Sequence, residues 1–261
     1  MNFRIVWAVV VRHLYNFKHS LDRLTDSFYW PAMDIFIWGF TSLYITKQSN
    51  QPSQVIISLL SGVVLWLVVW RAQYEITVNL LEEMWSRNLV NMFASPLRVR
   101  EWVLGVFILG LIKMFLSVGF SILLALVLYK TNIFSLGFYL IPFMVSLTIT
   151  GWAVGMLISG LIIRYGMRIQ TFAWGGIFLL APFSGVYYPT SILPLWAQKV
   201  STFLPTSYIF EGMRSVVFEG SMYYGDLVKS FVLNIIYLIL GLFFFTIMFN
   251  KSKTRGLADL E

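Results

Sequence analysis

The chain has 261 residues, of which 58% are hydrophobic and only 12% are charged, and its Lys and Arg residues exceed its Asp and Glu residues by 7. An ordinary soluble domain is about 45–50% apolar and about 25% charged. This composition excludes a soluble globular domain, a disordered chain and a typical nucleic-acid-binding domain, and it indicates a protein whose solvent is a lipid bilayer. The sequence contains no Cys, which excludes disulfides, thiolate nucleophiles and Cys-ligated metals.

The N-terminal segment is amphipathic and too weakly apolar to cross a membrane. Its apolar run, residues 5–11, is shorter than a spanning helix, and no small-residue cleavage site follows it. Basic residues and aromatics alternate over residues 2–20, which is typical of a helix lying in the membrane interface. We therefore predict an interfacial helix within residues 1–27. The basic residues within residues 2–20 are Arg4, Arg12, His13, Lys18 and His19.

Six apolar stretches follow, and each approaches the roughly 20 residues that a spanning helix needs. The second stretch is short, and the third and fourth are long enough to tilt. The pattern predicts an all-α integral membrane protein in which residues 1–261 form a single transmembrane domain. The stretches are residues 28–45, 55–70, 102–129, 136–163, 171–188 and 227–249.

The distribution of Lys and Arg predicts the orientation of these spans. Of the 19 basic residues, 13 lie in the N-terminal segment, the second-to-third connection, the fourth-to-fifth turn and the tail, whereas Lys113 lies inside the third span. Basic residues accumulate on the cytoplasmic side of a membrane. Both termini are therefore predicted to be cytoplasmic, in agreement with an even number of spans. The expected location is the cell's inner, or cytoplasmic, membrane.

The connection between the second and third spans contains a predicted amphipathic helix over residues 80–96. Apolar residues recur there at helical spacing on one face. Glu82 and Glu83 lie in its first turns, where negative charge suits a helix N-terminus, and Pro96 ends it. Two interpretations remain open: a surface helix that rests on lipid headgroups, or a helix that docks into a groove of a soluble partner.

This connection resembles the coupling-helix region of ABC-2-type transporter permeases. Glu83 matches the acidic start of that pattern, Leu89 its leucine, and Ser95-Pro96 the step before the third span. Arg87 and Asn88 stand where the family has Gly-Thr. The resemblance implies that a separate ATPase subunit docks on this segment. The implied docking residues are Glu82, Glu83, Trp85, Arg87, Leu89, Met92, Phe93, Ser95 and Pro96.

A second match to the same family follows the fifth span. Ser184-Gly185, the aromatic step before Pro189, and the later Leu-Pro-x-Trp, x-Pro-x-x-Tyr and Gly-x-Arg steps occur in the family's order. The prolines exclude one long helix, and irregular backbone survives at membrane depth only inside protein. We predict a re-entrant segment of short helices over residues 189–214, with an ordinary amphipathic outer loop as the alternative. The resemblance implies an external gate formed by Ser184, Gly185, Tyr187, Tyr188, Pro189, Pro194, Trp196, Pro205, Tyr208, Gly212 and Arg214.

Two charged residues lie inside predicted spans, where charge is costly and marks candidate functional sites. We hypothesise that Asp34 in the first span pairs with Lys113 in the third, although Lys113 could instead snorkel and Asp34 could lie at a wet interface. Separately, Gly151, Gly155 and Ser159 recur every four residues, which predicts close packing of the fourth span against another helix.

The resemblance implies a type V ABC exporter-like fold and a homodimeric permease that is not itself an enzyme. Such a subunit exports an amphipathic substrate (a polysaccharide, a lipid or a drug-like molecule), while ATP and Mg are bound by its ATPase partner and no cofactor by this chain. The sequence contains no P-loop motif, and its two histidines lie six residues apart without an acidic cluster, which argues against a metal site. The alternatives are a transporter or channel without an ATPase, and a membrane enzyme around Glu211 and Arg214.

Overall fold

The computed structural model describes residues 2–47, 52–88, 91 and 95–255, with side chains as far as Ser252, and this described part is helical and contains no strand. The longer helices are α1 (Phe3–His19), α2 (Leu21–Thr46), α3 (Pro52–Trp85), α5 (Val99–Tyr129), α6 (Leu140–Tyr165), α10 (Pro205–Glu219) and α11 (Tyr224–Arg255). The shorter ones are η1 (Ile133–Tyr139), η2 (Gly166–Ile169), α7 (Phe172–Gly175), η3 (Gly176–Leu179), α8 (Ala181–Ser184), η4 (Thr190–Ile192) and α9 (Leu195–Ser201).

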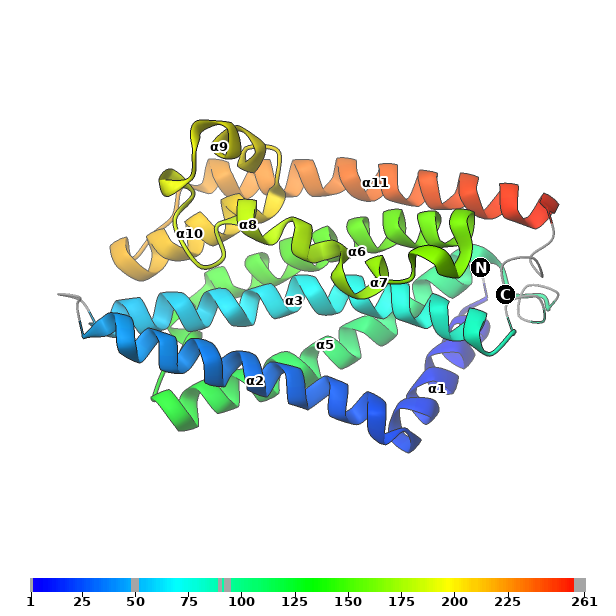
Figure 1. Ribbon diagram of the computed structural model, residues 1–261, viewed down its shortest axis with the longest axis horizontal. Helices are drawn as coiled ribbons and strands as arrows, with labels where there is room; N and C mark the ends of the chain where they lie inside the picture. The colour runs from blue at the N-terminus through cyan, green and yellow to red at the C-terminus, as the bar shows by residue number, and fades with distance from the viewer. Residues whose placement is uncertain (1, 48–51, 89–90, 92–94, 256–261) are drawn as a thin grey trace.

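The long helices form a bundle in which α3 occupies the centre (Figure 1). Helix α3 packs against α2, α5 and α6, and α11 lies along the other side of α6. The start of α1, the end of α3 and the end of α11 lie at one end of the bundle, and α9 and α10 lie at the opposite end. After the orientation predicted from the sequence, we call these the inner and outer ends. The core follows α3, where residues 60–69 are buried without exception.

Four described stretches are long and apolar enough to cross a membrane, and they contain the second, third, fourth and sixth predicted spans. These stretches are Pro52–Trp85, Val99–Tyr129, Ile133–Ile169 and Tyr224–Ser252. The first predicted span lies within α2, which is 26 residues long but carries Asp22, Arg23, Asp26 and Asp34 and is therefore less apolar. The chain is thus an all-α, multi-pass membrane protein.

The predicted end of the second span was wrong. We expected the span to stop at Trp70 and to be followed by a connection, but α3 continues without a break to Trp85. The continuation is polar in sequence yet buried, because its side chains find partners on neighbouring helices. Gln73 and Thr77 both donate to the carbonyl oxygen of Ala173 in α7, each at 2.9 Å.

The predicted fifth span, residues 171–188, is not one continuous helix. Residues 172–184 form an apolar but broken stretch of single turns, α7, η3 and α8. Gly175 and Gly176 favour a break because glycine costs a helix about 1 kcal/mol relative to alanine, and Pro182 has no N–H to donate. Gly185 then ends the stretch with a positive φ of 70°.

The N-terminal unit predicted over residues 1–27 contains two helices rather than one. Helix α1 ends at His19, and the side chain of Ser20 caps α2 by accepting the N–H of Arg23. Residues from Leu21 onward therefore belong to the long helix α2. One face of α1 is buried against α5, and the opposite face is exposed and aromatic. The buried residues are Val6, Val10, His13 and Phe17.

The small-residue stripe of the fourth span does mediate close packing, as predicted. A Cβ atom added at Gly151 would lie 2.5 Å from both the Ala72 Cβ and the Val69 carbonyl oxygen of α3. At Gly155 the nearest atom would be the Ile76 Cδ1, at 2.9 Å. These two glycines allow α6 to approach the α3 backbone, which places α3 at the centre of the bundle.

Candidate functional site

An ion network, buried around Arg71, Glu75 and Lys113 and partly exposed at Arg12, joins α1, α2, α3 and α5 at the inner end. Arg71 is fully buried, and its Nη1 lies 2.9 Å from Asp26 Oδ2 and 3.7 Å from Glu75 Oε1. Glu75 Oε2 in turn accepts from Lys113 Nζ at 2.7 Å. The network also contains the pairs Arg23–Glu82 and Arg12–Glu83, both at 2.9 Å. These four cations and four anions balance, which is the condition under which buried charges are tolerated.

This network overturns the hypothesis that Asp34 pairs with Lys113. Lys113 bonds Glu75 of α3, and its Nζ also lies 5.1 Å from the centre of the Phe17 ring. Asp34 lies two helical turns from Asp26 on α2 and takes no part in the network. The hypothesis was wrong because Glu75 was assigned to an aqueous connection, whereas the continuation of α3 buries it beside α5.

The predicted docking helix over residues 80–96 is interrupted. Helix α3 ends at Trp85, and Arg87 adopts a left-handed φ of 52°, so no single helix covers this segment. The N–H of Asn88 bonds the Glu83 carbonyl oxygen at 2.9 Å, which closes the helix end. This geometry favours glycine, the residue that the family pattern has near this position.

The predicted docking residues divide into buried and exposed groups. Glu82 and Glu83 turn inward, toward Arg23 and Arg12, and Glu83 is 1% exposed. Leu89, Met92 and Phe93 lie outside the described residues. The four that lie on the surface are Trp85, Arg87, Ser95 and Pro96. Trp85 also stacks on Trp174 of α7 with ring centres 6.0 Å apart, so it links the end of α3 to the broken fifth stretch.

Sequence analysis missed a contact that ties the chain's beginning to α5. Glu101 accepts the backbone N–H of Asn2 at 2.7 Å through Oε1, and that of Arg98 at 3.1 Å through Oε2. One carboxylate therefore holds the start of α1 and the start of α5 together. An acidic residue three positions after a helix N-cap is the sequence signal that would have indicated this capping role.

At the outer end, the predicted external gate residues cluster around α10. The Ser184 and Thr206 hydroxyls lie 2.7 Å apart, and Arg214 donates to the Gly185 carbonyl oxygen. Glu211 accepts the N–H of Thr190 at 2.6 Å and also binds Arg214. Burial alone would raise the pKa of the Glu211 carboxyl, but the Arg214 charge and these hydrogen bonds hold it below its usual value.

The remaining predicted gate residues begin or brace the short outer helices. Pro189 and Pro194 are the N-caps of η4 and α9, and Pro205 is the first residue of α10, where the missing N–H costs nothing. The other braces are Tyr187 stacked on Trp38 of α2, Tyr188 donating to Pro182, Trp196 against Phe183, Tyr208 donating to Thr202, and Gly212 close to Met222.

A chamber of about 590 Å³ opens between α2, α3 and the broken fifth stretch. Its lining combines aromatic rings with two carboxylates, those of Asp26 and Asp34. Two stripes of period four supply most of it: Asp26, Trp30 and Asp34 on α2, and Trp66, Trp70 and Tyr74 on α3. Sequence analysis missed this chamber, although residues four apart share a helix face and both stripes are visible in the sequence.

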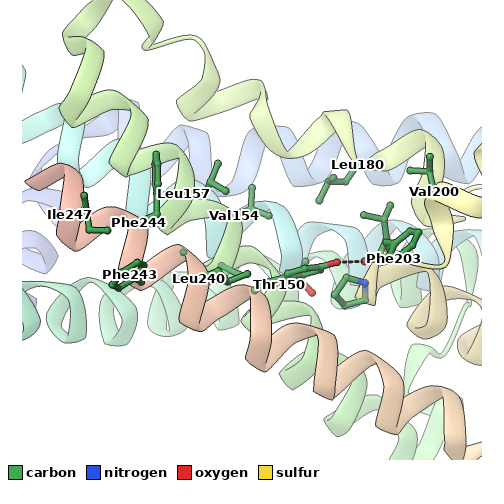
Figure 2. A pocket seen from close by; sticks show the side chains of 15 residues that line it. Thr150, Val154, Leu157, Leu180, Val200, Phe203, Leu240, Phe243, Phe244 and Ile247 are labelled. Carbon is green, nitrogen blue, oxygen red and sulfur yellow. Dashed lines mark hydrogen bonds between the residues drawn. The ribbon is translucent and has the colours of Figure 1, made fainter.

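A second cavity, of about 630 Å³, lies between α6 and α11 and is almost entirely apolar (Figure 2). Leu240, Phe243, Phe244 and Ile247 of α11 line it on one side, and Leu157 of α6 lines it on another. Its lining offers no charged group. The chamber beside α2 is therefore the better candidate for selecting a polar or charged ligand.

Comparison with known proteins identifies the class to which this bundle belongs. A family model for ABC-2 family transporter proteins matches residues 39–250, so the chain belongs to the ABC-2 transporter family. It is also similar to the ABC transporter G family member 20 of Dictyostelium discoideum, with 26% identity over 210 residues. That match covers 79% of this chain and 28% of the relative's length. The chain is thus a transporter membrane subunit, not itself an enzyme, and matches little more than a quarter of that relative.

Proposed function

We propose that this chain is the permease subunit of an ATP-driven exporter, which moves an amphipathic substrate outward across the cytoplasmic membrane. The observation that carries the proposal is the ABC-2 family match over residues 39–250. The similarity to an ABC transporter of the G family supports it. ATP and Mg would bind on a separate ATPase subunit, and two copies of this chain would enclose the path.

The proposed topology has six crossings with both termini in the cytoplasm. Helix α2 would be the first crossing: its 26 residues extend about 39 Å, more than the roughly 30 Å of a bilayer core. Residues 171–188 would form the fifth crossing as a broken helix sheltered by α3 and α6, which satisfies the rule that irregular backbone inside a membrane is surrounded by protein. The excess of basic residues near the inner end supports this orientation.

The ATPase subunit would dock at the inner end, on the segment that follows α3. Trp85, Arg87, Ser95 and Pro96 are the exposed part of that segment. Because α3 is one helix from Pro52 to Trp85, a displacement of its inner end would reach the Trp66, Trp70 and Tyr74 side of the chamber. The ion network would make the inner ends of α2 and α5 move with α3. ATP-driven closure of the ATPases would then change access from the inner to the outer side, where the α10 cluster would act as the external gate.

Co-purification with candidate ATPase subunits tests this function. We expect the wild-type chain to retain one ATPase and to stimulate its ATP hydrolysis when substrate is added. Arg87→Glu together with Trp85→Ala should weaken that association, whereas Lys199→Glu, an exposed change at the outer end, should not. Retention unaffected by the double variant would contradict docking at this segment. Transport by the chain alone would favour the alternative of a transporter or channel without an ATPase.

A further inference from the structure

Behind the wall of the chamber between α2 and α3 lies one complete example of cation binding, in which three lining residues hold the buried Arg71. Asp26 binds the buried guanidinium of Arg71 at 2.9 Å. The guanidinium carbon lies 4.8 Å from the centre of the Trp70 ring and 5.4 Å from that of Tyr74. A cation is thus held between a carboxylate and aromatic faces, the arrangement that also recognises organic ammonium ligands.

Asp34 lies about 12 Å further along α2 than Asp26. There the chamber again places a carboxylate near aromatic rings, but without a paired cation from the described residues. Asp34 lines the chamber, and no ion pair or hydrogen bond joins it to another residue within the described ranges. Nearby Trp30, Trp174 and Phe178 leave 55%, 36% and 48% of their surfaces exposed. What this half of the chamber presents to a ligand is therefore one carboxylate, one threonine hydroxyl and several aromatic faces.

Among the other polar groups of the lining, only the exposed Thr171 offers a hydroxyl to a ligand. The indole N–H groups of Trp66 and Trp70 are covered and have no acceptor, and Asp26 is occupied by Arg71. A neutral sugar needs several convergent donors and acceptors, which this half lacks, and an anion would meet two carboxylates. A cation with an apolar body satisfies both Asp34 and the rings.

We propose that the chamber binds lipophilic organic cations, with Asp34 as the counter-ion and the exposed rings of Trp30, Trp174 and Phe178 as the cage. This inference rests on the proposed function only in treating the chamber as part of the transport path, and it names the substrate class. The volume of about 590 Å³ lies in the range of pockets that enclose drug-sized ligands. The carboxylate supplies charge selection, and the rings supply affinity for the apolar body.

The test is equilibrium binding to the purified chain in lipid nanodiscs, without any ATPase. Radiolabelled tetraphenylphosphonium is the cationic probe, and phenyl glucoside is the neutral, sugar-bearing probe. We expect saturable binding of tetraphenylphosphonium that Asp34→Asn weakens by about tenfold or more and Asp34→Glu largely retains. Trp174→Leu should also weaken it. Asp22→Asn, an exposed change on the same helix, should leave it unchanged.

Three results would overturn the inference: no saturable binding of tetraphenylphosphonium by the wild type, equal affinity in Asp34→Asn, or selective binding of phenyl glucoside. If Asp34→Asn fails to fold, the preference of the wild type for tetraphenylphosphonium over phenyl glucoside still tests charge selection, and Trp174→Leu still tests the aromatic cage. The outcome is separable from the proposed function. Cation binding without association with any ATPase would contradict only the exporter, and association without cation binding would contradict only this inference.

Discussion

Replacing Glu75 by Gln tests whether the ion network holds the inner end of the bundle together. Glu75 is 1% exposed, and its carboxylate lies 2.7 Å from Lys113 Nζ and 3.7 Å from Arg71 Nη1. The amide keeps the shape of the side chain but leaves four cations facing three anions. Removing one partner of a buried ion pair costs about 3–5 kcal/mol, because the other charge stays buried without compensation. We expect Glu75→Gln to lower the free energy of unfolding by that amount.

The assay is reversible unfolding in detergent micelles for wild type, Glu75→Gln, Lys113→Met and the double variant. The double variant returns the network to three cations and three anions, so it should lose less stability than the sum of the single changes. Asp226→Asn, which breaks the exposed Asp226–Lys229 pair, should change stability by no more than about 1 kcal/mol. The reasoning is refuted if Glu75→Gln is no worse than Asp226→Asn, or if the double variant loses the full sum.

Three further predictions concern packing, pH and backbone strain. Gly151→Ala should lower the free energy of unfolding by roughly 1–3 kcal/mol, because its Cβ would meet the backbone of α3, whereas Gly119→Ala, whose Cβ would meet nothing within 4 Å, should not lower it. Burial, together with the nearby charges of Arg12, Lys113 and Arg23, lowers the pKa of His13 to about 3, while Glu83 lies 3.6 Å away. The folded state therefore favours neutral His13, and its contribution to stability is complete above pH 6.5 and is lost at about 1.4 kcal/mol per unit as the pH falls toward 3. Melting curves at pH 7 and pH 5 should show that His13→Gln loses less stability between these pH values than the wild type does. An equal loss of stability in the two proteins would contradict the lowered pKa of His13. Arg87→Gly and Lys130→Gly should each raise stability by about 1 kcal/mol, because both residues hold positive φ, and a decrease in both would argue against backbone strain.

The apolar runs of the sequence predict much of the bundle but not the full length of α3. The apolar run ends at Trp70, because Arg71, Glu75 and Asn79 are polar residues of the kind expected in an aqueous connection. Arg71 and Glu75 are each neutralised by a partner more than thirty residues away in the sequence. Asn79 is hydrogen-bonded to Glu75, one helical turn away. A single sequence does not show which distant partner a charge will meet, so Lys113 was assigned to the wrong acid.

Other parts of the candidate site were within reach of the sequence. Ser184, Gly185, Thr206 and Arg214 all lie in the family motifs that the sequence shows after the fifth span, and the structure joins Ser184 to Thr206 and Gly185 to Arg214. The prolines at the starts of the outer helices indicate the boundaries of those helices. The break in the fifth stretch is signalled by Gly175-Gly176 and Pro182. The chamber required comparing two helices at once: each period-four stripe is visible alone, but only the packing of α2 on α3 brings them face to face.

Helix α3 connects the three places at which the proposed exporter subunit would have to act. Its outer part touches the external segment, because a Cβ at Gly62 would lie 2.7 Å from the Val186 carbonyl oxygen. Its middle supplies one wall of the chamber, and its end reaches the surface at Trp85. A helix of 34 residues spans about 51 Å, and its polar part is held by ion pairs to three other helices rather than by apolar contacts alone. Because the Arg71 and Lys113 pairs are directional and their cations are buried, rotating or sliding α3 alone would break them, so the inner ends of α2 and α5 have to move with it. The proposed coupling therefore needs no flexible relay: a force on the segment after Trp85 would move one wall of the chamber as part of a rigid body.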